Sequence, residues 1–173
     1  HFQRLMYEYL QIEFDVPLTE IEQIYWDNAA PGAAMPYVNE LLTYLDKREI
    51  RTGVISNIGF SGEALTTRLN RLLPNNRLEF VIASSEYMIR KPNLMLFELA
   101  LRKAGLEAKD VWFCGDSSTA DVMGASSVGI LPVWYEDLTM ENPFREKNSK
   151  LPACEHLHIY DWREMIKILE DLA

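Results

Sequence analysis

Apolar and aromatic side chains recur at helical spacing in the N-terminal part of the chain. FQRLMYEYLQIEF, residues 2–14, predicts one helix, and TEIEQIYWDNAA, residues 19–30, predicts a second one. Thr19 and Glu22 have the spacing of a capping box at the start of the second helix. A stripe of apolar residues between positions 35 and 45 predicts a third helix. The first part of the chain is therefore expected to be helical.

From residue 50 onward, short apolar runs alternate with longer helical stretches. Such runs, rich in β-branched and aromatic residues, predict strands that are buried on both faces. They are TGVISN (52–57), LEFVIAS (78–84), VWFCGD (111–116), ILPVWY (130–135) and HLHIY (156–160). Strands joined by helices are typical of right-handed βαβ crossovers. We therefore expect an α/β fold built on a parallel sheet.

The helices between these strands carry recognisable ends. The helix over residues 93–105 is expected to begin at Asn93, a good capping residue, and to end at Gly105. The other helices are expected over 62–73 and 119–129 and, after the last strand, behind the capping residues Asp161 and Glu164.

Composition and charge narrow the classes of partner. The chain has 173 residues, of which 48% are hydrophobic and 25% charged, as in an ordinary globular domain. Its net charge of -9 argues against nonspecific binding to nucleic acid or to an anionic membrane. No apolar stretch approaches the roughly 18 residues that span a bilayer. Two cysteines are too few for a disulfide framework, so a cytoplasmic location is expected.

Polar side chains stand at or shortly after the ends of three of the predicted strands. Ser56 and Asn57 end the first strand, Lys91 follows the second, and Asp116 and Asp121 follow the third. The carboxyl ends of parallel strands are where such sheets bind ligands. Carboxylates are ligands for Mg²⁺, and a lysine and a hydroxyl can hold phosphoryl oxygens. Each residue alone has a simpler explanation as a cap, a turn residue or a solvated charge, but together they favour a site.

Three segments resemble the motifs of a known superfamily. GVISN, RKPNLMLFELALRKAGL and CGDSSTADVMGASSVGILPVWY are similar to the second, third and fourth motifs of the haloacid dehalogenase-like hydrolases. The similarity extends over nearly the whole chain. It implies a Rossmann-like parallel sheet in a core domain over residues 31–173. Residues 1–30 resemble the C-terminal part of a helical cap.

The resemblance also implies a role for each polar residue at the strand ends. Ser56 would bind the transferring phosphoryl group, helped by the backbone of Asn57. Lys91 would stabilise negative charge on the nucleophile and on the phosphoryl oxygens. Asp116 would ligate Mg²⁺, and Asp121 would support the metal site or Lys91 without binding the metal itself. The implied reaction is hydrolysis of small phosphorylated metabolites through an aspartyl-phosphate.

One family motif has no match in the chain. The family's nucleophile lies in an Asp-x-Asp motif after a first strand, and neither Asp15 nor Asp27 follows an apolar strand or has a second aspartate two residues later. That strand belongs between those ending at Ser56 and Asp116, and without it two sheet edges would stay unpaired. We therefore expect an N-terminal segment of the same protein, removed by truncation or cleavage, to supply it, and the 173-residue chain alone to be inactive. A natural protein without the strand is the other possibility.

Two other functions are compatible with the motifs. A 2-haloacid dehalogenase-type hydrolase attacks carbon without a metal, and the pair Asp116 and Asp121 favours the phosphatase over it. A noncatalytic fragment or binding module is the third hypothesis.

Some conspicuous residues are expected to be structural. Trp134 and Tyr135 lie on a predicted strand and are expected to pack in the core or against the cap. His156 and His158 have no acidic cluster beside them in the sequence. The polar stretch 136–150 is expected to be a solvated loop.

Overall fold

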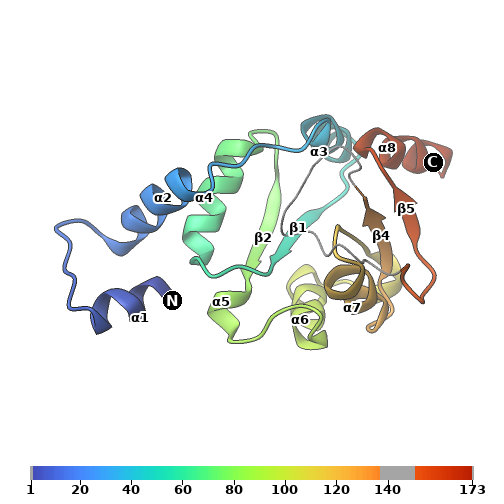
Figure 1. Cartoon of the computed structure of the whole chain (residues 1–173). Helices are drawn as coiled ribbons and strands as arrows, with labels where there is room; N and C mark the ends of the chain where they lie inside the picture. The colour runs from blue at the N-terminus through green and yellow to red at the C-terminus, as the bar shows by residue number, and fades with distance from the viewer. Residues whose placement is uncertain (1, 137–150, 173) are drawn as a thin grey trace. The chain divides into compact units, whose positions relative to one another are not determined.

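The computed structural model describes residues 2–136 and 151–172 (Figure 1). They belong to two compact units, His1–Arg90 and Lys91–Ala173. Most of the polar stretch expected to form a solvated loop lies outside the described residues. Within the described part of the chain, no helix is long and apolar enough to cross a membrane. The division between cap and core expected near residue 30 stays a prediction.

The first unit combines helices with a pair of parallel strands. β1 and β2 pair in parallel from Thr52 opposite Leu78 to Ser56 opposite Ala83. The first helix ends several residues earlier than its apolar pattern predicts. The elements are α1 (Phe2–Tyr9), α2 (Leu18–Ala29), α3 (Val38–Lys47), β1 (Thr52–Ser56), α4 (Gly62–Leu72), β2 (Leu78–Ala83) and α5 (Ser84–Tyr87).

The core of the first unit lies where α2 packs on α4. Trp26 of α2 is buried with Ala64 and Leu65 of α4 and with Ala83 of β2. The Trp26 ring stacks on Phe60, with the ring centres 4.2 Å apart and the planes 2° from parallel. The aromatic residues of the second predicted helix therefore serve to attach that helix to the unit.

Glu22 does not close a capping box. α2 begins behind Pro17 without a side-chain cap, and Glu22 is buried instead. Its carboxylate accepts hydrogen bonds from the backbone N–H of Ser61, at 3.3 Å, and from the Ser61 hydroxyl. Ser61 in turn caps α4 by accepting from the N–H of Ala64. The expectation was wrong because a buried carboxylate needs donors, and α4 supplies them.

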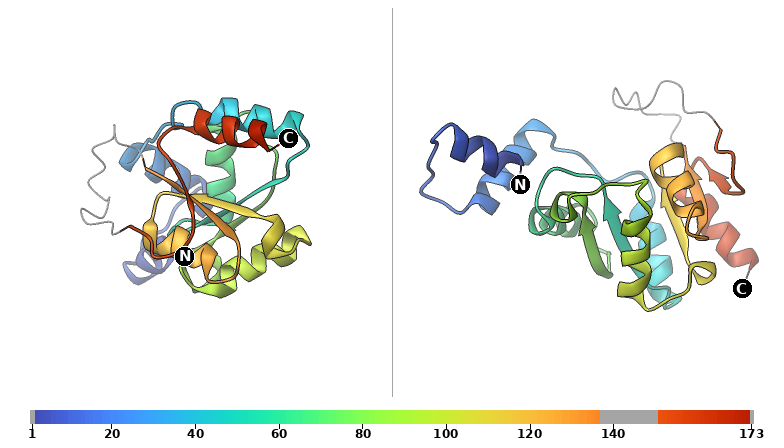
Figure 2. Two further views of the ribbon diagram at one scale, coloured as in Figure 1. Left: turned by 90° about the vertical axis from the view of Figure 1, so that its right-hand side faces the viewer. Right: turned by 90° about the horizontal axis from the view of Figure 1, so that it is seen from below.

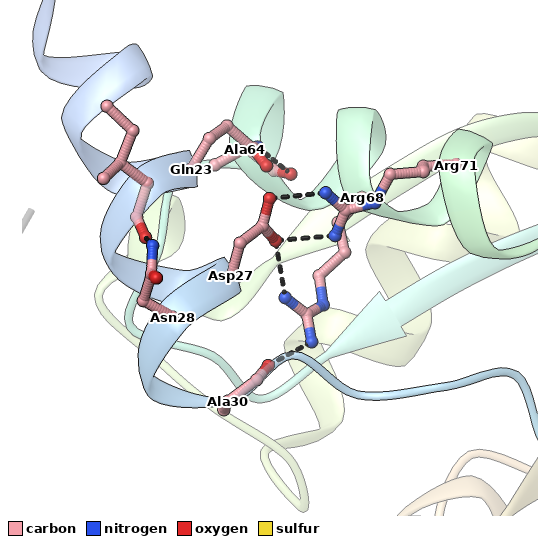
Figure 3. Close-up of polar contacts among 8 residues, drawn as sticks. Gln23, Asp27, Asn28, Ala30, Ala64, Arg68 and Arg71 are labelled. Atoms are coloured by element: carbon pink, nitrogen blue, oxygen red, sulfur yellow. Dashed lines mark hydrogen bonds and ion pairs between the residues drawn. The ribbon is translucent and has the colours of Figure 1, made fainter.

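A second polar contact joins the same two helices (Figure 3). Asp27 of α2 lies 3.2 Å from Arg68 and 2.6 Å from Arg71, both on α4. Arg68 also donates to the carbonyl of Ala30, and its guanidinium lies 4.4 Å from the centre of the Trp26 ring. Ionic and aromatic contacts thus hold the C-terminal end of α2 against α4.

We expect the Asp27 pair to make stability depend on pH. The hydrogen bond from Arg71 lowers the pKa of Asp27, so its contribution is complete above the unfolded-state pKa of about 4 and is lost as pH falls through the lowered value. Asp27→Asn should lower the urea midpoint at pH 7, and the difference from the unaltered chain should shrink below pH 4. Asp46→Asn, an exposed site for which no ion pair is described, is the control. A difference that is the same at both pH values would contradict this role.

The second unit is built around three parallel strands (Figure 2). The strand order is β3-β4-β5, and both pairings are parallel. The elements are α6 (Leu94–Ala104), η1 (Ala108–Asp110), β3 (Trp112–Gly115), the π-helical turn η2 (Ser118–Met123), α7 (Gly124–Ser126), β4 (Leu131–Tyr135), β5 (Leu157–Ile159) and α8 (Trp162–Asp171). Parallel strands joined by helices in both units confirm the α/β class.

Three helix ends predicted in the second unit are confirmed, whereas the helix predicted over 119–129 is the π-helical turn η2 followed by α7, which ends at Ser126. The Asn93 side chain accepts from the N–H of Met95 at 3.0 Å, and Gly105 ends α6 with a left-handed φ of 66°. Asp161 caps α8 by accepting from the N–H of Arg163 at 2.8 Å. These caps are local, which is why the sequence pattern alone located them.

Four of the described strands pair on one side only, and β1 and β3 are two of them. Among the described residues, β1 is hydrogen-bonded to β2 and β3 to β4, with no strand on the other edge of either. The first strand of the family, expected between those ending at Ser56 and Asp116, stays a prediction.

Candidate active site

The carboxyl end of β3 presents Asp116 to solvent. β3 ends at Gly115, and Asp116 is the next residue and is exposed. Folding does not bury the charge of this carboxylate, so the fold does not have to offset a desolvation cost. At the end of a parallel strand, the carboxylate is accessible to a ligand.

Asp121, in contrast, is buried and engaged. Its Oδ1 lies 2.6 Å from Nζ of Lys91, and the two side chains are 6% and 10% exposed. Its Oδ2 accepts a hydrogen bond from the backbone N–H of Ser117 at 3.0 Å. The ammonium also lies 5.2 Å from the centre of the Phe113 ring. Lys91 and Asp121, 30 positions apart in the sequence, therefore form one buried ion pair directly behind the Asp116 turn.

Small residues let Asp121 come this close to β3. A Cβ on Gly115 would lie 2.4 Å from Cγ of Asp121, a distance that atoms do not tolerate. Ser117 starts the π-helical turn by accepting from the N–H of Ala120 at 3.0 Å, which turns Asp121 back toward the strand. On the far side, Gly124 packs against the Phe97 ring, where a Cβ would lie 2.7 Å from a ring carbon.

We expect Gly115→Ala to displace Asp121 from Lys91. The added methyl group has no room, so the variant should lose about 1–3 kcal/mol of unfolding free energy in urea. Gly59→Ala is the matched control, because a Cβ there meets no atom within 4 Å. Equal stability of the two variants would show that the contact at Gly115 can relax without cost.

Ser56 and Asn57 lie in the first unit. Ser56 is the last residue of β1 and is half-buried, and Asn57 follows it. The next turn is tied to the end of β2, because the N–H of Ile58 donates to Oγ of Ser84 at 3.0 Å. The Ser85 hydroxyl donates to the carbonyl of Phe60.

Sequence reasoning missed these two serines. Ser84 and Ser85 directly follow the second strand. A pair of hydroxyls at a strand end is the one sequence feature that could have pointed to their contacts with the turn after β1. The structure thus joins Lys91 and Asp121 at the Asp116 turn within one unit. The roles implied for Lys91, Asp116 and Asp121, like those of the residues after β1, stay predictions.

The donor set at this turn is compatible with Mg²⁺. Within residues 2–136 and 151–172, no group of three or more His, Cys, Asp or Glu could hold a metal ion. A closed zinc site needs four such ligands. Mg²⁺ instead binds one or two carboxylates and fills its shell with water and phosphate oxygens. One exposed aspartate beside a paired one therefore fits the protein's share of a Mg²⁺ site.

The neighbouring cysteine is unsuited to catalysis. Burial raises the pKa of the Cys114 thiol to about 12. A thiol that stays protonated at neutral pH is neither a good nucleophile nor a metal ligand. Cys114 is therefore a structural residue of β3.

His158 has an acidic neighbour that sequence reasoning missed. Its Nε2 lies 3.1 Å from Oε2 of Glu136. Glu136 directly follows β4, the strand beside β5, so the two residues are 22 positions apart in the sequence and adjacent in the sheet. Trp134, expected in the core or against the cap, is 3% exposed and stacks on His158.

Comparison with known proteins identifies the family. Residues 6–134 match the family described as haloacid dehalogenase-like hydrolase. The chain belongs to that family. A glyceraldehyde 3-phosphate phosphatase of Methanothermobacter thermautotrophicus is 25% identical to this chain over 158 residues, which are 90% of this chain and 64% of the relative. The chain thus spans just under two thirds of that relative's length.

Solved structures confirm the fold. A HAD phosphatase from Thermococcus onnurineus superposes with a TM-score of 0.66 at 22% identity, covering 96% of this chain and 69% of the other. A 2-haloacid dehalogenase from Pseudomonas syringae pv. Tomato superposes with a TM-score of 0.60 at 24% identity, covering 80% and 54%. The chain therefore shares its fold with a protein described as a phosphatase and with one described as a dehalogenase.

Proposed function

We propose that the protein is a Mg²⁺-dependent phosphatase that hydrolyses small phosphate esters. The observation that carries this proposal is the buried Lys91–Asp121 ion pair directly behind the exposed Asp116. A metal-free displacement at carbon has little use for an exposed carboxylate backed by a second one. A phosphatase uses it to hold Mg²⁺, which offsets the phosphate charge in a chain whose net charge is -9.

Each residue then has a defined task. Asp116 ligates the metal, and Lys91 stabilises the negative charge that gathers on the nucleophile and on the phosphoryl oxygens. Asp121 holds the Lys91 ammonium in place. Ser56 and the backbone N–H of Asn57 bind the phosphoryl group.

The nucleophile is assigned to no residue of the printed sequence. No aspartate in it is followed by another two positions later, as the family's first motif requires. We take the nucleophile to be an aspartate on a segment outside these 173 residues. Its carboxylate would attack phosphorus, break the P–O bond of the ester and release the alcohol, which takes up a proton. Water would then hydrolyse the aspartyl-phosphate to inorganic phosphate and the free aspartate. The printed chain alone is accordingly expected to be inactive.

Substrate class and location follow from similarity and composition. The similar archaeal protein is named for a small phosphate ester, glyceraldehyde 3-phosphate, which supports a small phosphorylated metabolite as substrate. Two free cysteines and an acidic composition support a cytoplasmic location and no affinity for nucleic acid or membranes.

The similar fold of a 2-haloacid dehalogenase makes that activity the second candidate. An assay of the whole protein decides between them, with p-nitrophenyl phosphate and 2-chloropropionate as substrates, each with MgCl₂ or with EDTA. We expect phosphate release that requires MgCl₂ and no chloride release. Chloride release that is unaffected by EDTA would instead identify a dehalogenase. Absence of both products would favour a noncatalytic binding module.

A further inference from the structure

The backbone of Asp116 is held by a side chain from the neighbouring strand. The indole N–H of Trp134 donates to the Asp116 carbonyl oxygen at 3.2 Å. Trp134 lies on β4 opposite Gly115, in the last residue pair of the β3–β4 ladder. The indole thus continues the hydrogen bonding between these strands by one residue, onto Asp116.

The adjoining N–H is held as well. The Asp116 carbonyl and the Ser117 N–H belong to one planar peptide group. Trp134 binds its oxygen, and Oδ2 of Asp121 accepts from its N–H at 3.0 Å. A peptide group held at both ends cannot rotate freely, so the direction of the Asp116 side chain is restricted before any ligand arrives.

The Trp134 ring is itself fixed. It is 3% exposed, and its face stacks on His158 with ring centres 4.3 Å apart and planes 14° from parallel. His156 packs edge-on against it at 6.0 Å. The His158 ring is held in turn by Glu136, 3.1 Å from its Nε2. The indole cannot turn away from Asp116 without losing these contacts.

We infer that Trp134 is a positioning residue for the Asp116 carboxylate, and that it acts by fixing the Asp116–Ser117 peptide group. This inference rests on the proposed function, in which Asp116 ligates Mg²⁺. Partners that orient a metal ligand typically contribute about 10–100-fold in metal affinity. A single neutral hydrogen bond lies at or below the lower end of that range, so loss of the indole N–H should weaken Mg²⁺ binding by about 3–10-fold.

The same unit offers a matched control. Trp162 is also a stacked tryptophan, with its ring 4.5 Å from that of Tyr135 and 11° from parallel. Its indole nitrogen is buried, and no hydrogen-bond partner for it exists among the described residues. Trp162→Phe therefore removes a buried N–H that donates no hydrogen bond to any described residue. Trp134→Phe removes the N–H that donates to the Asp116 carbonyl.

The experiment is a titration of the ¹⁵N-labelled whole protein with MgCl₂, followed by NMR. The indole signal of Trp134, identified by its loss in Trp134→Phe, should shift together with the amide signals of Asp116 and Ser117. Trp134→Phe should raise the MgCl₂ concentration at half-saturation about 3–10-fold, and Trp162→Phe should leave it unchanged. Without metal, the Ser117 amide should exchange with solvent faster in Trp134→Phe than in Trp162→Phe.

The outcomes separate the inference from the function on which it rests. Unchanged half-saturation and unchanged Ser117 exchange in Trp134→Phe would overturn the inference, and the phosphatase proposal would stand. If no signal of the unaltered protein responds to MgCl₂, or if Asp116→Asn titrates normally, the metal site fails and the inference fails with it. Should Trp134→Phe not fold, the indole signal is assigned instead through its nuclear Overhauser contact with the stacked His158 ring. A Trp134 indole signal that stays still while the Asp116 amide shifts would then equally overturn the inference.

Discussion

Asp116→Asn is expected to reduce Mg²⁺-dependent phosphate release by the whole protein more than about 100-fold, because removing even an outer partner of a metal ligand costs about 10–100-fold. The substitution keeps the shape of the side chain and removes its charge. Since Asp116 is exposed, the fold should hardly change. The measurement is the rate of phosphate release as a function of MgCl₂ concentration, with the urea midpoint recorded for each protein.

Asp110→Asn is the matched control for that experiment. Asp110 is also an exposed aspartate of the second unit, located just before β3. It should leave both the rate and the midpoint unchanged. If Asp116→Asn releases phosphate as fast as the unaltered protein, Asp116 is not a metal ligand, whatever the control shows.

Breaking the Lys91–Asp121 pair is expected to have the largest effect on stability. The two side chains are 10% and 6% exposed, so removing Lys91 leaves the buried Asp121 carboxylate without its ammonium partner. Lys91→Met should therefore lower the unfolding free energy by about 3–5 kcal/mol. Asp121→Asn should cost less, because the amide oxygen can still accept from the N–H of Ser117. Urea unfolding at pH 7 gives these values.

The double variant separates loss of a pair from loss of packing. Lys91→Met combined with Asp121→Asn leaves neither charge of the buried pair, so the double variant should be more stable than the sum of the single effects predicts. Lys109→Met is the control, because Lys109 forms an ion pair with Glu107 in which both side chains are 74% exposed. That change should cost no more than about 1 kcal/mol. Additive effects at Lys91 and Asp121 would show that the two charges do not depend on each other.

Sequence reasoning was most successful where the physical cause is local. Asn93 and Asp161 cap the starts of α6 and α8, and Gly105 caps the end of α6, as predicted. A cap depends on residues only two to four positions away. Runs rich in apolar and β-branched residues marked each of the five strands in the described part of the chain, because such side chains pack well on a sheet. The prediction was wrong at Glu22. A local capping rule placed this carboxylate at the start of α2, but it is buried and accepts hydrogen bonds from Ser61 at the start of α4.

In the candidate site, too, residue order indicated some features and tertiary packing decided others. Order along the chain named Lys91, Asp116 and Asp121 as candidates, and the structure brings Lys91 within 2.6 Å of Asp121 next to the Asp116 turn. Which aspartate is exposed and which is paired was decided by packing: the missing Cβ of Gly115 admits Asp121, and Lys91 then neutralises it.

Residue types and their order were therefore sufficient for the α/β class, the caps of α6 and α8 and the family, since each depends on neighbours in the sequence or on strand periodicity. The hydrogen bond from Trp134 to Asp116 and the contact of His158 with Glu136 join residues 18 and 22 positions apart. Only the folded sheet brings such groups within hydrogen-bonding distance, because β4 must first lie between β3 and β5.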